Sequence, residues 1–522
     1  MDARCADAVF YNGNVITMDA RHGTVRAIAV AEGRIVGVGE DKEMKDVAPR
    51  GSDSIDLGGR TVLPGFIDCH THFIQMGVDS MNVDLSRTCS IEEALAAMKD
   101  VAKKTPGGAW VIGANWKESG WKDGRFITGK DLDGCCPDHP AVAHRVCGHM
   151  SSVNTMAINA LGITPQTPDV GRDSSGKLTG ILTESAVVIA RTATAPDKAK
   201  KAKALALATK KAHSLGVTSI HDNGETADFR TYRDAEAAGK LGVRVWFNYP
   251  ANALDMLNAL SVSKGVGSDW LRIGGVKLFC DGALGARSAA LSEPYADDAG
   301  NKGMFVHDSS EFEGIVRKAN ASGHQLAIHA IGDMGIEATI SALETALAES
   351  PMKDHRHRIE HLELPSRAHL TRMRKSKIIA SMQPNFIGEW GGTNGMYMDR
   401  LGAKRTSRNN PFGEALEARL KLVFGSDCMP FSPLYGIHSA VNAPHASQRI
   451  DVASSISAYT ADAAFASFDE RRKGSLSEGK LADFIVLSDN PFEAPSMISS
   501  MSVLKTIVGG NIVYEKRRAT GG

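Results

Sequence analysis

The sequence has no excess of charge of either sign, no paired-cysteine motif and no long apolar run. Its 522 residues include 60 Lys+Arg and 60 Asp+Glu, so the formal net charge is zero, which argues against a nucleic-acid partner, because such binders carry a basic excess. The eight cysteines are scattered without a C-x-x-C pair, which argues against a zinc ribbon or disulfide framework and fits a reducing compartment. No apolar run reaches about 18 residues, so we expect no membrane partner and a cytoplasmic protein.

Both ends of the chain have the pattern of short β-strands separated by Gly-containing turns. The apolar runs lie at 8–11, 14–18, 27–31 and 34–38, and again at 483–487, 503–508 and 512–515. Neither end has enough strands to close a β structure alone. We therefore expect residues 1–64 and 470–522 to form one composite β-sandwich.

The centre of the chain alternates short apolar runs with helical stretches such as 198–215, 310–322 and 335–349. Eight runs read as buried strands: 65–68, 217–220, 243–249, 273–279, 325–328, 358–360, 378–382 and 422–425. This order is typical of an α/β protein built on a parallel (β/α)8 TIM barrel, here over residues 65–469. The gap after the first strand is too long for one crossover, so we expect an insertion at about 75–200 over the barrel mouth.

Histidine and aspartate side chains occur at the ends of several of these predicted strands. His70 and His72 are two residues apart, so they point to the same side of a strand and can share one metal ion. A bare H-x-H pair is as often two ordinary polar residues. His329, His361 and Asp427 also end apolar runs. Because active sites of TIM barrels lie at the carboxyl ends of the strands, the four strand ends together favour a metal site.

Lys277 lies in the middle of the fourth predicted strand, Ile273–Phe279. Alternation turns its neighbours Val276 and Leu278 toward the helices, which leaves Lys277 facing the barrel interior. Desolvation favours the neutral amine there. A neutral amine can add carbon dioxide and become a carbamate, whose two oxygens can bridge two divalent ions. The pattern alone leaves a second interpretation equally open, in which Lys277 reaches the mouth and pairs with Asp281.

These residues in combination resemble the metal set of the amidohydrolase superfamily. The motifs that carry the resemblance are Pro64-Gly65-Phe66-Ile67-Asp68 with His70 and His72, then Lys277, His329, His361 and Asp427, and finally Gly479-Lys480-Leu481-Ala482-Asp483-Phe484. More narrowly, stretches at 148–161, 180–184 and 281–287 are similar to the family-3 amidohydrolases, the group with N-substituted formamide deformylases. The resemblance covers essentially the whole chain.

The resemblance implies a binuclear metal centre. His70, His72 and Asp427 would hold the more buried ion, His329 and His361 the more exposed one, and carboxylated Lys277 would bridge the two. Zinc is the ion that we expect from these imidazole and oxygen ligands, with manganese, iron and cobalt as alternatives. The implied reaction is hydrolysis of an amide-type C–N bond of a small molecule, with Asp427 as general base and then general acid.

Substrate contacts are expected from outside the metal set. His149 lies in the predicted insertion, between a strand-like run at 141–146 and a helical run at 152–161. It can reach the barrel mouth and contact the substrate, or it can form a cap or loop hydrogen bond. Arg287 follows the fourth barrel strand. Arg287 can bind a substrate carboxylate bidentately or can anchor its own loop. Two other functions remain open: a ring deaminase of the same superfamily, against which Lys277 counts, and a non-catalytic scaffold, against which the intact ligands count. Whether the chain forms a homo-oligomer is also left open.

Overall fold

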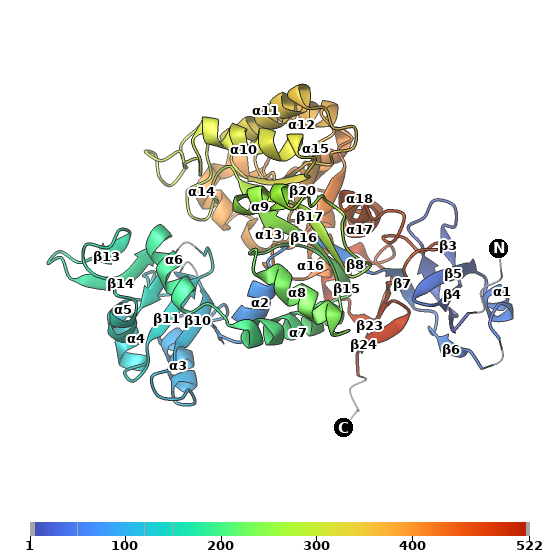
Figure 1. Ribbon diagram of the computed structural model, residues 1–522, viewed down its shortest axis with the longest axis horizontal. Helices are drawn as coiled ribbons and strands as arrows, with labels where there is room; N and C mark the ends of the chain where they lie inside the picture. The colour runs from blue at the N-terminus through green and yellow to red at the C-terminus, as the bar shows by residue number, and fades with distance from the viewer. Residues whose placement is uncertain (1–5, 50, 119–120, 149, 518–522) are drawn as a thin grey trace. The chain divides into compact units, whose positions relative to one another are not determined.

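Eight parallel strands form the central sheet of the protein, whose computed structural model describes residues 6–49, 51–118, 121–148 and 150–517. The strands are β8 (Phe66–Thr71), β15 (Val217–Asn223), β16 (Arg244–Pro250), β17 (Leu271–Phe279), β18 (Leu326–Ala330), β19 (Arg358–His361), β20 (Ile379–Met382) and β21 (Leu422–Phe424). They pair in chain order from β8 to β21 (Figure 1). The predicted TIM-type barrel is therefore confirmed.

The first and last strands, β8 and β21, approach each other closely where the barrel closes. A Cβ added to Gly425 would lie 2.4 Å from the backbone nitrogen of His70, so only glycine fits where these two segments of backbone meet. The Asp427 amide donates to the His70 carbonyl at 2.8 Å, and the Ser426 amide donates to the Asp68 carboxylate at 2.9 Å. These bonds bring the two ends of the barrel sheet together beside the histidine pair.

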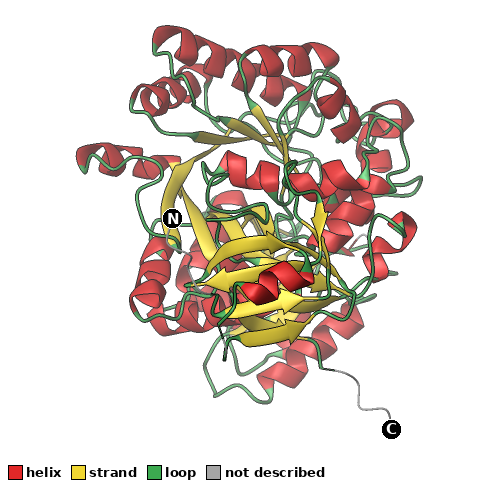
Figure 2. Ribbon diagram, turned by 90° about the vertical axis from the view of Figure 1, so that its right-hand side faces the viewer, coloured by secondary structure: helices red, strands yellow, loops and turns green. Residues whose placement is uncertain are grey.

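Helices follow most barrel strands and pack around them, as the alternating sequence predicts (Figures 1 and 2). They are α7 (Lys198–Ser214), α8 (Asp228–Ala237), α9 (Leu254–Ala259), α10 (Ser309–Ala321), α11 (Asp333–Glu349), α12 (Arg367–Lys375), α13 (Asn385–Trp390), α14 (Met396–Thr406), α15 (Phe412–Glu417), α16 (Pro433–Val441), α17 (Val452–Ala458) and α18 (Ala461–Ala466). Short 3-10 turns lie at Ala251–Ala253 and Pro495–Ser500. The three predicted helical stretches correspond to α7, α10 and α11 within two residues at each end.

The two ends of the chain supply two further β-sheets. One contains β1 (Ala8–Tyr11), β4 (Ala27–Ala31), β5 (Arg34–Gly39) and β6 (Asp53–Asp56), beside helix α1 (Asp41–Asp46). The other joins β2 (Asn14–Ile16), β3 (Thr24–Val25) and β7 (Thr61–Pro64) to β22 (Phe484–Leu487), β23 (Val503–Val508) and β24 (Asn511–Glu515). Phe10 and Phe484 meet edge to face at 4.8 Å in the shared core. The composite sandwich is therefore confirmed (Figure 2).

A buried ion pair attaches the sandwich to the barrel. Arg244, at the start of β16, donates from Nε and Nη2 to the Asp483 carboxylate at 2.5 and 2.8 Å, and both side chains are 4% exposed. Asp483 also accepts from the Gly509 amide at 2.8 Å. A bidentate, fully hydrogen-bonded pair of this kind holds its partners in one geometry, although its net contribution to stability is small.

The chain separates into two compact units, Met1–Phe73 with Ala208–Gly522, and Ile74–Leu207. The second unit contains its own sheet, in the order β13-β14-β12-β11-β10-β9. Its strands are β9 (Val83–Asp84), β10 (Val111–Trp116), β11 (Ala141–Arg145), β12 (Met150–Val153), β13 (Val170–Arg172) and β14 (Leu178–Thr183). Its helices are α2 (Phe73–Asp79), which begins at the boundary, α3 (Ile91–Ala102), α4 (Gly129–Cys135), α5 (Thr155–Ala160) and α6 (Glu184–Ala193).

One predicted boundary in this second unit is wrong. The helix expected at 152–161 begins only at Thr155, because Ser152 and Val153 pair with neighbouring strands as part of β12. Asn154 caps the helix by accepting from the Ala157 amide at 2.9 Å, which is the ordinary role of asparagine at that position. In the part of the chain that the structure describes, no helix has the length and apolarity needed to cross a bilayer.

Candidate metal centre

Three potential ligands converge where β8 and β21 end. His70 lies near the end of β8 and His72 just beyond it, while Asp427 follows β21. The Asp427 Oδ1 atom lies 3.6 Å from Nε2 of His70 and 3.4 Å from Nε2 of His72, and the potential ligand atoms of the three residues lie within 4.8 Å of one another. Asp427 has a positive φ of 51°, so the chain bends sharply after β21 and turns this carboxylate toward the histidine pair.

His329 and His361 lie beside this group, at the ends of β18 and β19. The His361 ring centroid is 4.8 Å from that of His70 and 4.4 Å from that of His329. His361 has a φ of 73°, which ends the strand and reorients the side chain. His329 donates from Nε2 to the Gly282 carbonyl at 3.0 Å, so its neutral tautomer has a lone pair on Nδ1.

Lys277 lies on β17 and is 4% exposed. Within the described residues its Nζ has no hydrogen-bond partner, and the nearest ring is that of Phe279, with its centroid 4.8 Å away. Burial lowers the pKa of Lys277 to about 8, against the opposing effects of Glu360 and Asp427. The predicted inward orientation therefore matches the position of Lys277, and the alternative ion pair with Asp281 is not formed.

Burial also sets the protonation of the surrounding groups. It lowers the pKa of His70 and of His361 well below the usual value, so both rings are neutral, the form in which imidazole binds a metal. Burial raises the pKa of Asp427 to about 7, with Lys277 acting in the opposite direction. A carboxyl group of this kind can gain and lose a proton near neutral pH.

Glu360 is a part of this site that the sequence reasoning missed. Its Oε2 lies 2.5 Å from Nδ1 of His70 and accepts from the Ser381 hydroxyl at 2.8 Å, while Arg358 pairs with its other oxygen. Since a carboxylate only accepts, Nδ1 of His70 donates, and Nε2 is left with its lone pair toward Asp427. Alternation along β19 was the available signal, because Arg358 and Glu360 share the inward face.

Of the two residues predicted to bind substrate, Arg287 lies within the described part of the chain. Arg287 forms a bidentate pair with Asp297, at 3.1 and 2.8 Å, and Arg400 also binds this carboxylate. This contact corresponds to the loop-anchoring alternative that the sequence left open. His149 lies outside the described residues.

The donor set fits a divalent cation. Neutral imidazoles and a carboxylate beside two of the histidines are donors that borderline ions such as Zn²⁺ prefer. Among the described residues, the Lys277 amine and the buried Nδ1 atom of His361 have no hydrogen-bond partner. Buried polar atoms normally have one, so these two atoms do not fit an apolar core or an ordinary ion pair.

The chain matches known proteins over nearly its full length. The model of the amidohydrolase family matches residues 53–514. YtcJ of Bacillus subtilis, whose name assigns it to the amidohydrolases, is 32% identical over 98% of this chain and 99% of its own. The N-substituted formamide deformylase of Arthrobacter pascens is 28% identical over 98% of both chains.

Solved structures give the same result. A metal-dependent hydrolase from Pyrococcus horikoshii superimposes with a TM-score of 0.79 at 28% identity, over 93% of this chain and 98% of that one. A second, from Pyrococcus furiosus, has a TM-score of 0.78 at 29% identity, over 93% and 99%. We conclude that this chain belongs to the amidohydrolase family and is a metal-dependent hydrolase.

Proposed function

We propose that the protein hydrolyses an amide-type C–N bond of a small molecule. The observation that carries this proposal is the convergence of His70, His72 and Asp427 beside Lys277, a buried amine with no hydrogen-bond partner among the described residues. The similarity to a protein named as an N-substituted formamide deformylase supports the choice of bond. No serine or cysteine nucleophile is needed for this chemistry.

We assign the ligands as follows. His70, His72 and Asp427 would hold the more buried of two divalent ions, and His329 and His361 the more exposed one. Lys277, carboxylated at Nζ, would bridge them, because a carbamate supplies two oxygens and one negative charge. Zinc is the proposed metal, since imidazole and oxygen donors suit it.

Bound divalent ions would supply an activated water and polarise the substrate carbonyl. The protein's own contribution is then proton transfer by Asp427. Its carboxylate accepts the proton of the attacking water and delivers it to the leaving nitrogen, which releases an amine and a carboxylate.

A hydrolysis screen tests the proposal. The zinc-loaded protein is incubated with N-formyl, N-acyl and cyclic amides, and amine release is measured together with the metal content. Amine release with close to two ions per chain supports the proposal. Ammonia release from a heterocycle with one ion would indicate a ring deaminase, and a metal-free, inactive protein would indicate a scaffold.

Glu360→Gln should weaken metal binding by about 10–100-fold, the usual effect of removing a carboxylate that orients a ligating histidine. The glutamine carbonyl can still accept from Arg358, but its amide NH2 takes the place of the oxygen that accepts from Ser381 and from Nδ1 of His70. An NH2 group cannot accept from Nδ1, so the tautomer of His70 is no longer fixed. Metal affinity is measured by competition with a chelating dye. The matched control is Glu337→Gln, because Glu337 also contacts a histidine, His369, and an arginine, Arg372. Equal metal affinities in the two variants would show that Glu360 does not orient His70 for metal binding.

His149→Ala should lower kcat/KM by at least about tenfold, which corresponds to about 1.4 kcal/mol, without changing the metal content. The reason is that metal ions polarise most carbonyl groups to a similar extent, so selectivity for one substrate must come from other groups. His139→Ala is the control, since that ring bonds the Ala109 carbonyl within the same unit. If kcat/KM is unchanged, or if metal is lost, His149 is not a substrate contact, and Arg287→Gln is tested next.

A further inference from the structure

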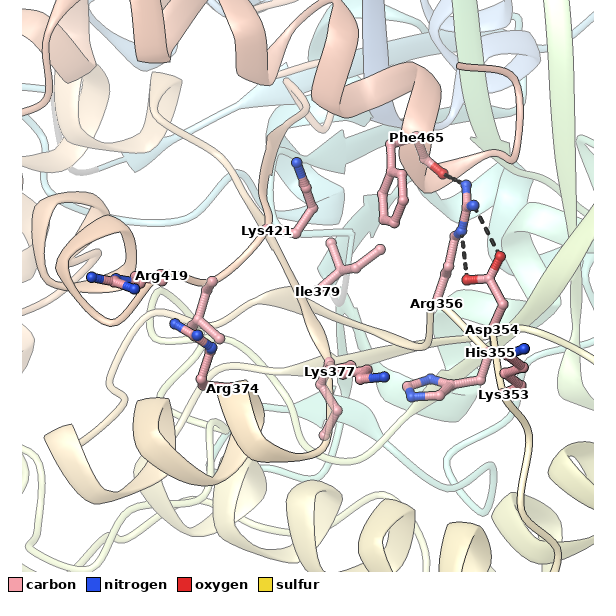
Figure 3. Close-up of a pocket in the computed structure, with 12 residues that line it drawn as sticks. Lys353, Asp354, His355, Arg356, Arg374, Lys377, Ile379, Arg419, Lys421 and Phe465 are labelled. Atoms are coloured by element: carbon pink, nitrogen blue, oxygen red, sulfur yellow. Dashed lines mark hydrogen bonds and ion pairs between the residues drawn. The ribbon is translucent and has the colours of Figure 1, made fainter. Parts of the chain in front are cut away.

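A basic pocket lies at the amino-terminal end of the barrel strands, the end opposite to the histidines (Figure 3). It has a volume of about 270 Å³ and lies where the chain enters β19, β20 and β21. Its cationic side chains are Lys353, Arg356, Arg374, Lys377, Arg419 and Lys421. In most TIM barrels this end serves stability rather than function, so a concentration of one charge here requires an explanation.

Carboxylates neutralise two of these cations. Arg356 bonds both oxygens of Asp354, at 2.9 Å each, and both oxygens of Glu470, also at 2.9 Å. Lys421 pairs with Asp462 at 2.5 Å. Asp354 is the one carboxylate that lines the pocket, and its position against Arg356 is visible in Figure 3.

The other four cations have no carboxylate within ion-pair distance in the part of the chain that the structure describes. They are Lys353, Arg374, Lys377 and Arg419. Arg374 donates to the Ala418 carbonyl at 3.3 Å, a contact that leaves its charge uncompensated. Like charges around a concave wall repel one another, and the wall focuses their potential into the pocket. A multiply charged anion would relieve this repulsion.

Phe465 supplies the accessible apolar surface of the pocket, because its side chain is half-buried. The other apolar lining residues are buried, with Ile378 and Ile379 each 1% exposed and Leu420 6% exposed. Phe465 completes the lining, and the Arg356 guanidinium lies 3.8 Å from the centre of its ring. A simple inorganic anion would satisfy the cations but would leave the exposed part of Phe465 in contact with water.

We propose that this pocket binds a small phosphorylated molecule with a flat apolar ring. The phosphate dianion would lie among Lys377, Arg374 and Arg419, because arginine forks and lysine ammonium groups recognise phosphate oxygens. The ring would lie against the exposed part of Phe465. The volume suits a small compound and lies just below the usual range for drug-sized ligands.

Calorimetric titration of the metal-loaded protein with phenyl phosphate tests the proposal. We expect a Kd below about 1 mM, weaker binding at higher salt, and at least about fivefold weaker binding of inorganic phosphate, which lacks the ring. Lys377→Gln with Arg419→Gln should weaken phenyl phosphate binding by about tenfold or more. Unchanged metal content and melting temperature in this double variant would show that it folds.

The control is Arg233→Gln with Lys318→Gln. It removes two exposed cations on helices that do not line the pocket, where Arg233 pairs with Asp234 and Lys318 with Asp255. This control should bind phenyl phosphate as the unaltered protein does. The proposal fails if phenyl phosphate does not bind up to about 10 mM. It also fails if the Lys377 and Arg419 double variant keeps full affinity, since the anion would then be bound elsewhere, such as at the metal centre.

Discussion

Lys277→Ala should remove most of the bound metal and essentially all of the hydrolytic activity. The side chain is buried beside Glu360 and Asp427, its Nζ has no hydrogen-bond partner in the described structure, and burial lowers its pKa to about 8. Such an amine is available to react with carbon dioxide. Alanine would remove the proposed bridge between the two ions. Metal analysis and amide hydrolysis measure the two effects, and a small added carboxylic acid should partly restore both.

Two further variants separate this role from a general effect of losing a buried lysine. Lys277→Glu keeps a carboxylate near the site and should retain more metal than Lys277→Ala. Lys473→Ala removes another buried lysine, which bonds Ser219 at 2.8 Å, and should lower stability without loss of metal. An unmodified Lys277 amine in a crystal of the fully metallated, active enzyme would contradict the proposal.

Asp427→Asn should keep the fold and much of the metal but lower kcat by about 10²–10⁴-fold, the usual contribution of a general acid–base group. Asparagine can still bind an ion through its carbonyl oxygen, but it cannot accept and return a proton. The measurement is kcat with the metal content determined on the same preparation. The expected signature is low kcat with the metal largely retained.

Asp222→Asn is the matched control for this variant. Burial raises the pKa of Asp222 to about 7, as it does for Asp427. Asp222, however, accepts hydrogen bonds from the Phe73 amide and from the hydroxyls of Thr71 and Tyr232. Its replacement should lower stability and change kcat by less than about tenfold. A kcat for Asp427→Asn close to that of the unaltered protein would exclude Asp427 as the proton carrier.

The barrel strands were predictable because each is buried on both faces and therefore reads as an apolar run between turns. The positions of His70 and Asp427 at strand ends followed from the same runs. The sandwich was predictable for a related reason, since neither end of the chain has enough strands to bury its own apolar surface. The predicted start of the helix after Asn154 was wrong, because hydrophobic periodicity does not distinguish the end of a short strand from the start of a helix.

The order of strands and helices, the residues at the strand ends and the family of the protein could all be predicted from the sequence, because they depend on local patterns and on motifs of fixed spacing. Only the tertiary structure showed that Glu360 orients His70 across the barrel and that Arg287 is held by Asp297. It alone also assembled the basic pocket from segments near 354, 377, 420 and 465. The physical reason is that these contacts join residues far apart in the chain, and their distances are fixed by barrel closure and packing rather than by any local pattern.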